Sequence, residues 1–140
     1  MTSIADNAFA NNKKLTKVTI GSNITTIGKK AFYKCTKLKT VKIGGKVTTI
    51  SEKAFYKCTS LTKITIPSKV KKIGQEAFFG CKNLKSITIQ TTKLTSKNVG
   101  SKAFRGIYAK ATIKVPKSKL TSYKKILKAK GVSSKAKIKK

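Results

Sequence analysis

The sequence feature that most constrains the fold is an internal repeat with a step of 23 residues. Its clearest marker is a series of phenylalanines at this step: Phe9, Phe32, Phe55 and Phe78. Alanines, leucines and paired β-branched residues keep the same step around them. A fixed period of 20–50 residues is typical of solenoids, in which each unit buries its apolar side only by stacking on its neighbours.

The chain divides into four full units and a partial fifth. The full units are Ile4–Thr26, Ile27–Thr49, Ile50–Lys72 and Ile73–Val99. The fourth unit is longer by three residues, which fall in the polar stretch Gln90–Asn98 and predict a loop at one rim. We therefore assign residues 1–116 to the repeats and residues 117–140 to a C-terminal capping helix and basic tail.

The C-terminal segment breaks the period. Ser118 is expected to be a helix N-cap, an apolar stripe follows, and Gly131 stands where a helix should stop. We predict a capping helix over Ser118–Lys130 and a polar tail that ends in a short strand.

Each unit has two halves with different periodicity. Alternation over Leu61–Ile66 predicts a strand that ends at Pro67. Apolar spacing over Ile50–Cys58 predicts one or two helical turns. The expected fold is an α/β solenoid, a right-handed superhelix with one short parallel strand per 23-residue unit.

The consensus I-x-x-x-A-F-x-x-C-x-x-L-x-x-I-x-I-P resembles the BspA-like class of leucine-rich repeats. The resemblance covers Ile4–Pro116, although Asn12 replaces the cysteine in the first unit, and Ile107–Lys140 is similar to the C-terminal ending of such proteins. It implies an extracellular or cell-surface protein of bacteria or some protozoa, with a role in adhesion. It transfers no binding residue.

Charge is the other dominant property. Lysine and arginine total 34 against three acidic residues, giving a net charge of +31, and Arg105 is the only arginine. Such a chain attracts polyanions. No apolar run reaches membrane-spanning length and no signal peptide is visible, so we expect no membrane insertion. We expect either a cytosolic protein or a piece of a longer secreted one, and the resemblance favours the second.

The predicted strand face carries the candidate ligand-binding lysines. No exposed column places two lysines in adjacent units, so like charges stay about 10 Å apart. The expected partner is an anionic host or cell-wall protein or glycan. Non-specific nucleic acid is the alternative, although scarce arginine argues against base readout. The candidates are Lys17, Lys39, Lys42, Lys63 and Lys85.

Other chemistry is nearly absent from the sequence. Without histidine there is no Ser-His or Cys-His catalysis and no histidine metal site, and no phosphate-binding loop occurs. The three acidic residues form no facing pair, and we place them at helical N-termini. We expect no enzyme, cofactor or metal. One cysteine per unit indicates buried, reduced core positions: Cys35, Cys58 and Cys81.

Two features leave alternatives open. The aromatic column Tyr33, Tyr56 and Phe79 either packs on the outer face or stacks nucleic-acid bases. Nothing before Ile4 covers the apolar side of the first unit. We expect this end to be covered by another chain, through end-to-end self-association, or by further repeats, which leaves a structural scaffold role open.

Overall fold

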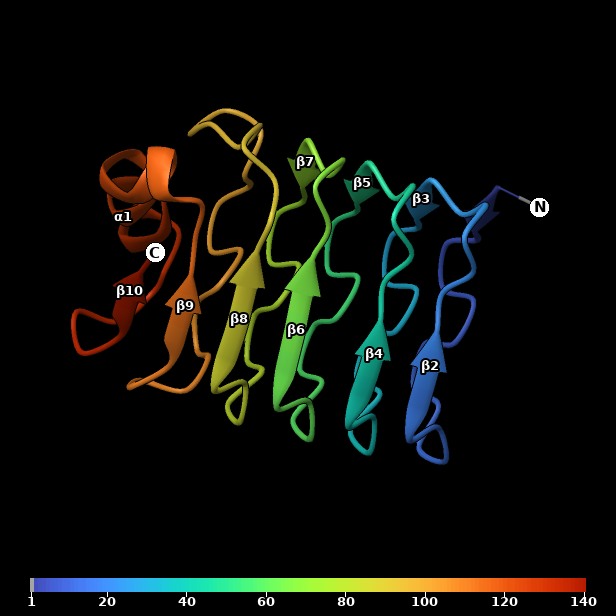
Figure 1. The fold of residues 1–140 in the computed structure, drawn as a ribbon. Coiled ribbons are helices and arrows are strands. Elements are labelled where there is room, and N and C mark those ends of the chain that lie inside the picture. Colours follow the sequence, from blue (N-terminus) through green and yellow to red (C-terminus); the bar gives the residue numbers. More distant parts are fainter. Residues whose placement is uncertain (1) are drawn as a thin grey trace.

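The computed structural model describes residues 2–140 as a solenoid of parallel strands (Figure 1). One side of the solenoid, here called the strand face, carries one strand from each unit and a last strand from the C-terminal tail, where a short strand was predicted. Every strand pairing in the described residues is parallel, as the repeat predicts. The strands of this face are β2 Lys17–Thr19, β4 Thr40–Lys42, β6 Lys63–Ile66, β8 Ser86–Ile89, β9 Thr112–Lys114 and β10 Lys137–Lys139.

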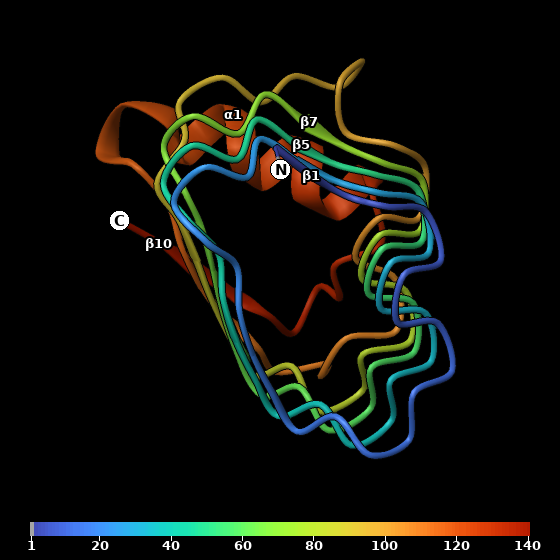
Figure 2. The same ribbon diagram turned by 90° about the vertical axis from the view of Figure 1, so that its right-hand side faces the viewer.

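A second sheet lies across the core from the strand face (Figure 2). Its strands have two residues each, and the isoleucine that opens each unit points into the core. The first four units therefore begin with a second short strand, in addition to the one predicted for each. The short strands are β1 Ser3–Ile4, β3 Thr26–Ile27, β5 Thr49–Ile50 and β7 Lys72–Ile73.

The predicted helical turns are wrong, because the segment after each short strand forms two consecutive tight turns. Ala31 N–H donates to the Gly28 carbonyl at 3.2 Å, whereas Phe32 N–H donates to Ala54 of the next unit at 2.8 Å. The backbone thus bonds along the solenoid axis. Each turn uses a left-handed residue, and pairs of these lie four positions apart: Asn7 and Asn11, Lys30 and Lys34, Lys53 and Lys57, Glu76 and Gly80, Lys102 and Gly106.

The core is centred on a ladder of phenylalanine rings. Phe32, Phe55, Phe78 and Phe104 are fully buried, and Phe9 begins the ladder at the N-terminal end. Adjacent rings are stacked with centroids 5.2–5.4 Å apart. The predicted burial of the repeat phenylalanines is confirmed.

The C-terminal end is closed by the short 3₁₀ helix η1 Lys117–Lys119 and by α1 Leu120–Ala129. This confirms the predicted helix but not its start, because Lys119 is the N-cap and no side chain caps the helix. Gly131 follows with φ of 111°, and a Cβ there would lie 2.6 Å from the Arg105 backbone. The glycine is therefore required by both its conformation and its close approach.

The lengthened fourth unit is also confirmed. Ile73 bridges to Val99, a step of 26 residues, and the surplus forms a loop at the rim above β8 (Figure 1). The buried Tyr123 of α1 ties this loop down, since its hydroxyl donates to the Thr91 carbonyl at 2.7 Å and accepts from Leu94 N–H at 3.2 Å.

Candidate binding surface on the strand face

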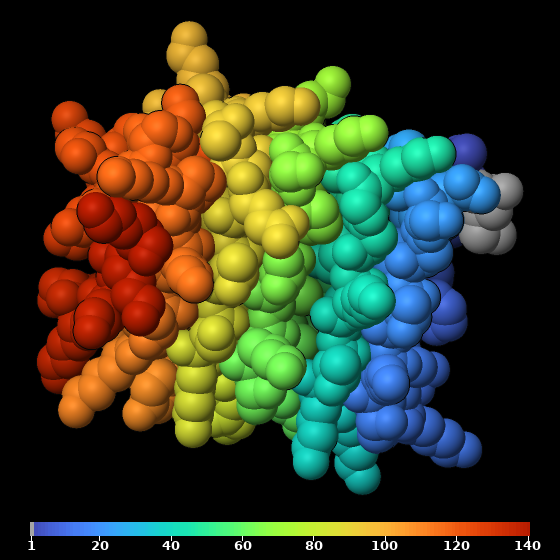
Figure 3. Space-filling view, in the orientation of Figure 1, coloured from blue at the N-terminus to red at the C-terminus, as the bar shows by residue number. Residues whose placement is uncertain are grey.

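The strand face presents all five predicted lysines to solvent. The register places Lys17 opposite Thr40, Thr19 opposite Lys42, and Lys63 opposite Ser86. In each of these pairs a lysine faces a hydroxyl residue of the neighbouring strand. The prediction that lysines do not lie side by side in adjacent units is confirmed at these positions. Figure 3 shows this side of the molecule, on which each unit forms one band.

The array extends further than the sequence predicted. Strands β9 and β10 add Lys114, Lys137 and Lys139, and all three are exposed. Lys139 lies directly opposite Lys114, an adjacent like-charge pair that the four repeats avoid. The pattern Lys137-Ile138-Lys139 was the available signal, because it repeats the polar–apolar alternation of the earlier strands.

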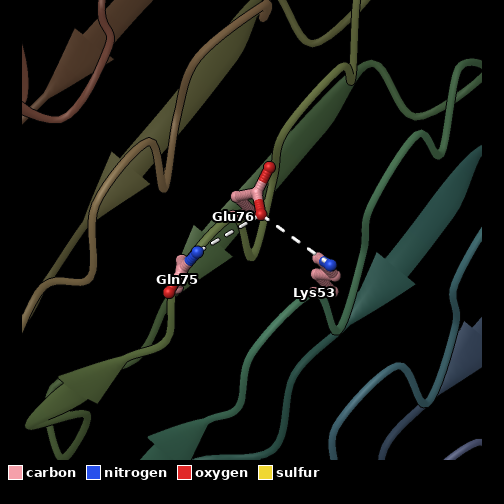
Figure 4. A network of polar contacts seen from close by, with 3 residues as sticks. All are labelled: Lys53, Gln75 and Glu76. Carbon is pink, nitrogen blue, oxygen red and sulfur yellow. Dashed lines mark hydrogen bonds and ion pairs between the residues drawn. The ribbon is translucent and has the colours of Figure 1, made fainter.

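No acidic residue lies in a strand of this face. The three carboxylates lie on the turn side instead. The Asp6 carboxylate accepts a hydrogen bond from Lys29 N–H at 2.8 Å, and Glu76 lies 3.9 Å from the Lys53 ammonium, the one ion pair within residues 2–140 (Figure 4). Their predicted placement at helical N-termini is wrong because these segments are turns. The strand face keeps an uncompensated positive charge.

The outer aromatic column is arranged for packing. Tyr33 stacks on Tyr56 at 5.0 Å and Tyr56 on Phe79 at 5.1 Å, so neighbouring rings occupy each other's faces. Lys30 and Lys34 lie 5.2 and 5.3 Å from the centre of the Tyr33 ring. A nucleic-acid base has no free ring face between these units on which to stack.

The cysteine column is part of the core. Cys35, Cys58 and Cys81 are fully buried and unpaired, as predicted. Each thiol donates a hydrogen bond at 3.1 Å to the carbonyl of the residue 26 positions earlier. Burial raises the pKa of all three thiols, for Cys81 to about 12. Such thiols are protonated and unreactive at neutral pH.

No group of three histidine, cysteine, aspartate or glutamate side chains in residues 2–140 is arranged to hold a metal ion. Within the same residues, no helix has the length and apolar character needed to cross a membrane.

The N-terminal end of the solenoid is open, as the sequence predicted. A hollow of about 380 Å³ exposes the apolar side of the first unit, and Phe9 is 42% exposed. Its walls include Ile4, Leu15, Val18 and Ile24.

The BspA-type leucine-rich repeat region matches residues 2–129, with six copies. The chain belongs to the BspA-type leucine-rich repeat family. The matched range covers all of the stacked units and extends into α1. The comparison with curated proteins gives no significant match.

Solved structures similar to this BspA-type chain come from bacteria. The T. pallidum leucine-rich repeat protein TpLRR is 30% identical with a TM-score of 0.72, over 83% of this chain and 53% of that one. A leucine-rich cell surface protein of Faecalibacterium prausnitzii A2-165 is 27% identical with a TM-score of 0.66, over 80% of this chain and 38% of that one.

The pneumococcal vaccine antigen PcpA shares the fold, with a TM-score of 0.72 at 22% identity over 99% of this chain and 38% of that one. The chain therefore spans about half, or less, of the length of these three relatives. Of these relatives, one is a cell surface protein and another is a vaccine antigen.

Proposed function

We propose that this chain is a non-enzymatic binding module of a bacterial surface protein, and that it adheres to anionic polymers through its strand face. Leucine-rich repeat proteins are generally binding scaffolds, because stacked units create extended surfaces. The likeness to a leucine-rich cell surface protein supports a location outside the cell.

The observation that carries this proposal is the lysine array itself. Three of the five predicted lysines lie in strands, Lys39 and Lys85 directly precede strands, and β9 and β10 add three more, with no acid in any strand of this face. Solubility alone does not need a net charge of +31, which also destabilises the compact state by self-repulsion. An anionic polymer lying across the strands neutralises that repulsion.

Affinity for heparin, measured from about 50 to 200 mM salt, tests the proposal. We expect binding to weaken steeply over that range, because lysine contacts release counterions from the polymer. A variant with the five lysines changed to glutamine should bind more weakly and show a smaller salt slope. In the control variant, five exposed lysines outside the strand face are changed to glutamine, so that both variants have the same net charge. These are Lys69, Lys71, Lys93, Lys97 and Lys102. Equal loss in both variants would dismiss the strand face as the site and favour protein–protein adhesion.

The open N-terminal end supports a second, structural role. We propose that its apolar hollow packs against another solenoid end, from a second chain or from further repeats. Self-association through this end should strengthen as salt screens the like charges of two copies, opposite to the trend for heparin. Light scattering at low and high salt measures it, and Phe9→Lys should abolish it. A monomer at every salt concentration would exclude association of this chain with itself.

A further inference from the structure

The strand face is not one continuous sheet. It parts between β4 and β6, giving a two-stranded sheet and a four-stranded sheet, and no backbone hydrogen bond joins β4 to β6 within residues 2–140. The same two units stay bonded elsewhere: Phe32 N–H donates to Ala54, and Ile27 pairs with Ile50. The opening is therefore local to this face.

Proline explains one missing bond. The register Ile66↔Ile89 sets Pro67 level with Gln90, whose N–H donates to the Ile66 carbonyl at 2.9 Å. Proline has no N–H, so Pro67 cannot make the equivalent bond to Ile43.

A second difference lies at the turn that follows the short strands. Glycine stands there in the neighbouring units because a Cβ would lie only 2.2–2.5 Å from the backbone of the preceding unit. The third unit has Ser51 instead, and its N–H still donates to the Ile27 carbonyl at 3.0 Å, against 2.7–2.9 Å for the equivalent glycines. A side chain thus stands between the same two units, but across the core from the parted strands. The equivalent glycines are Gly28, Gly74 and Gly100.

A hollow of about 180 Å³, here called the β4–β6 slot, lies over the parted strands and extends onto β8. Backbone N–H and C=O groups along the two unpaired strand edges need a partner, as any strand edge does. The lining combines two apolar side chains, Val41 and Ile64, with hydroxyl residues and one lysine: Thr40, Lys63, Thr65, Ser86 and Thr88.

The charge around the slot selects the partner. Lys39 and Lys42 flank it on the β4 side, Lys63 lines it on the β6 side, and no strand of this face has an acid. Edge N–H groups, hydroxyls and an ammonium together make a site for an oxyanion.

We propose that the β4–β6 slot seats an acidic group, a sulfate or carboxylate, of a polysaccharide lying on the strand face. This rests on the proposed function and deepens it by placing one specific contact within the array. Hydroxyls in the lining suit sugar hydroxyls as well. Nucleic acid fits less well, because the chain has one arginine and the stacked aromatic column has no free face between its units.

The first test compares two lysines at the same position in their units. Lys17 and Lys63 are both exposed on strands, and each change to glutamine removes one charge, but only Lys63 lines the slot. We expect Lys63→Gln to weaken binding of a heparin oligosaccharide about tenfold, and Lys17→Gln about twofold, because a seated anion loses a charge-assisted bond. Equal effects would overturn the slot and leave the strand-face proposal standing. If neither variant nor salt changes affinity, the proposed function itself fails.

The second test leaves the charge unchanged. The double variant Ser51→Gly, Pro67→Gln gives the third unit the residues that the fourth unit has at these positions, Gly74 and Gln90. The net charge stays +31. It should protect the amides of β4 and β6 from hydrogen exchange and weaken heparin binding about tenfold. Closure of the slot with undiminished affinity would overturn the inference.

Hydrogen exchange of the unaltered protein tests the proposal even if the slot of the double variant stays open. Adding heparin should protect the β4 and β6 amides more than those of β8, and failure to do so would also overturn the inference. Single-stranded DNA binding as tightly as heparin, with the same loss in Lys63→Gln, would assign the slot to phosphate in place of a polysaccharide acid.

Discussion

A phenylalanine-to-alanine substitution should lower the free energy of unfolding by different amounts at different positions of the phenylalanine ladder. Phe55 is fully buried between Phe32 and Phe78, at 5.2 and 5.3 Å, whereas Phe9 has one stacking neighbour and is 42% exposed. Phe55→Ala should cost about 4 kcal/mol, since it leaves a closed cavity and removes two stacking contacts. Phe9→Ala should cost about 1.5 kcal/mol, because little more than half of its surface is buried and no cavity forms at the open end.

Urea unfolding followed by circular dichroism measures both costs, at a few micromolar protein and low salt, where self-association is weakest. Urea is preferred to guanidinium because it adds no ions to screen the lysines. Phe78→Ala, which is also fully buried between two rings and does not line the N-terminal hollow, is the control and should match Phe55→Ala. If Phe9→Ala proves as costly as Phe55→Ala, the first unit is covered in solution and the reasoning from an open end is refuted.

Three further predictions concern the core. The free energy of unfolding should fall above pH 9, because burial raises the folded-state pKa of the thiols and the thiols of the unfolded chain lose their protons first. Cys81→Ala should remove up to about 1.4 kcal/mol per pH unit of this slope, measured by urea unfolding from pH 8 to 10.5. An unchanged slope would contradict this prediction. Tyr123→Phe should cost about 1–3 kcal/mol of stability by leaving the Thr91 carbonyl unpaired, and should speed proteolysis within residues 90–98. An unaltered digestion rate would show that the Tyr123 hydroxyl does not hold this loop. Gly74→Ala should cost at least about 2 kcal/mol of stability, since its Cβ would lie 2.3 Å from the Glu52 backbone nitrogen. Gly45→Ala should be nearly neutral, because no atom lies within 4 Å of the added Cβ. Similar melting of the two variants would refute the close packing of units.

The repeat period by itself determined the stacking of units, the parallel register and the burial of Phe32, Phe55 and Phe78. It also determined which lysines point outward, because the side-chain alternation of a strand and a fixed step leave little freedom. The open N-terminal end followed from the same reasoning, since a repeat without a neighbour exposes its apolar side.

Only the tertiary structure decided how the other half of each unit folds. The spacing of Ile50, Ala54 and Cys58 suits a helix or two tight turns equally, and the difference lies in whether backbone groups bond within the unit or to the next one. The turns prevail because stacked units offer carbonyls to bond, as Ala54 does to Phe32 N–H.

The same limit applies to the candidate site. Pro67 looks like ordinary variation within one unit, and its effect exists only across the junction with the unit before. Its missing N–H leaves one bond between β4 and β6 unmade, which matters only when a second backbone lies beside it. Sequence fixes what each unit presents, and packing decides whether neighbouring strands bond or part.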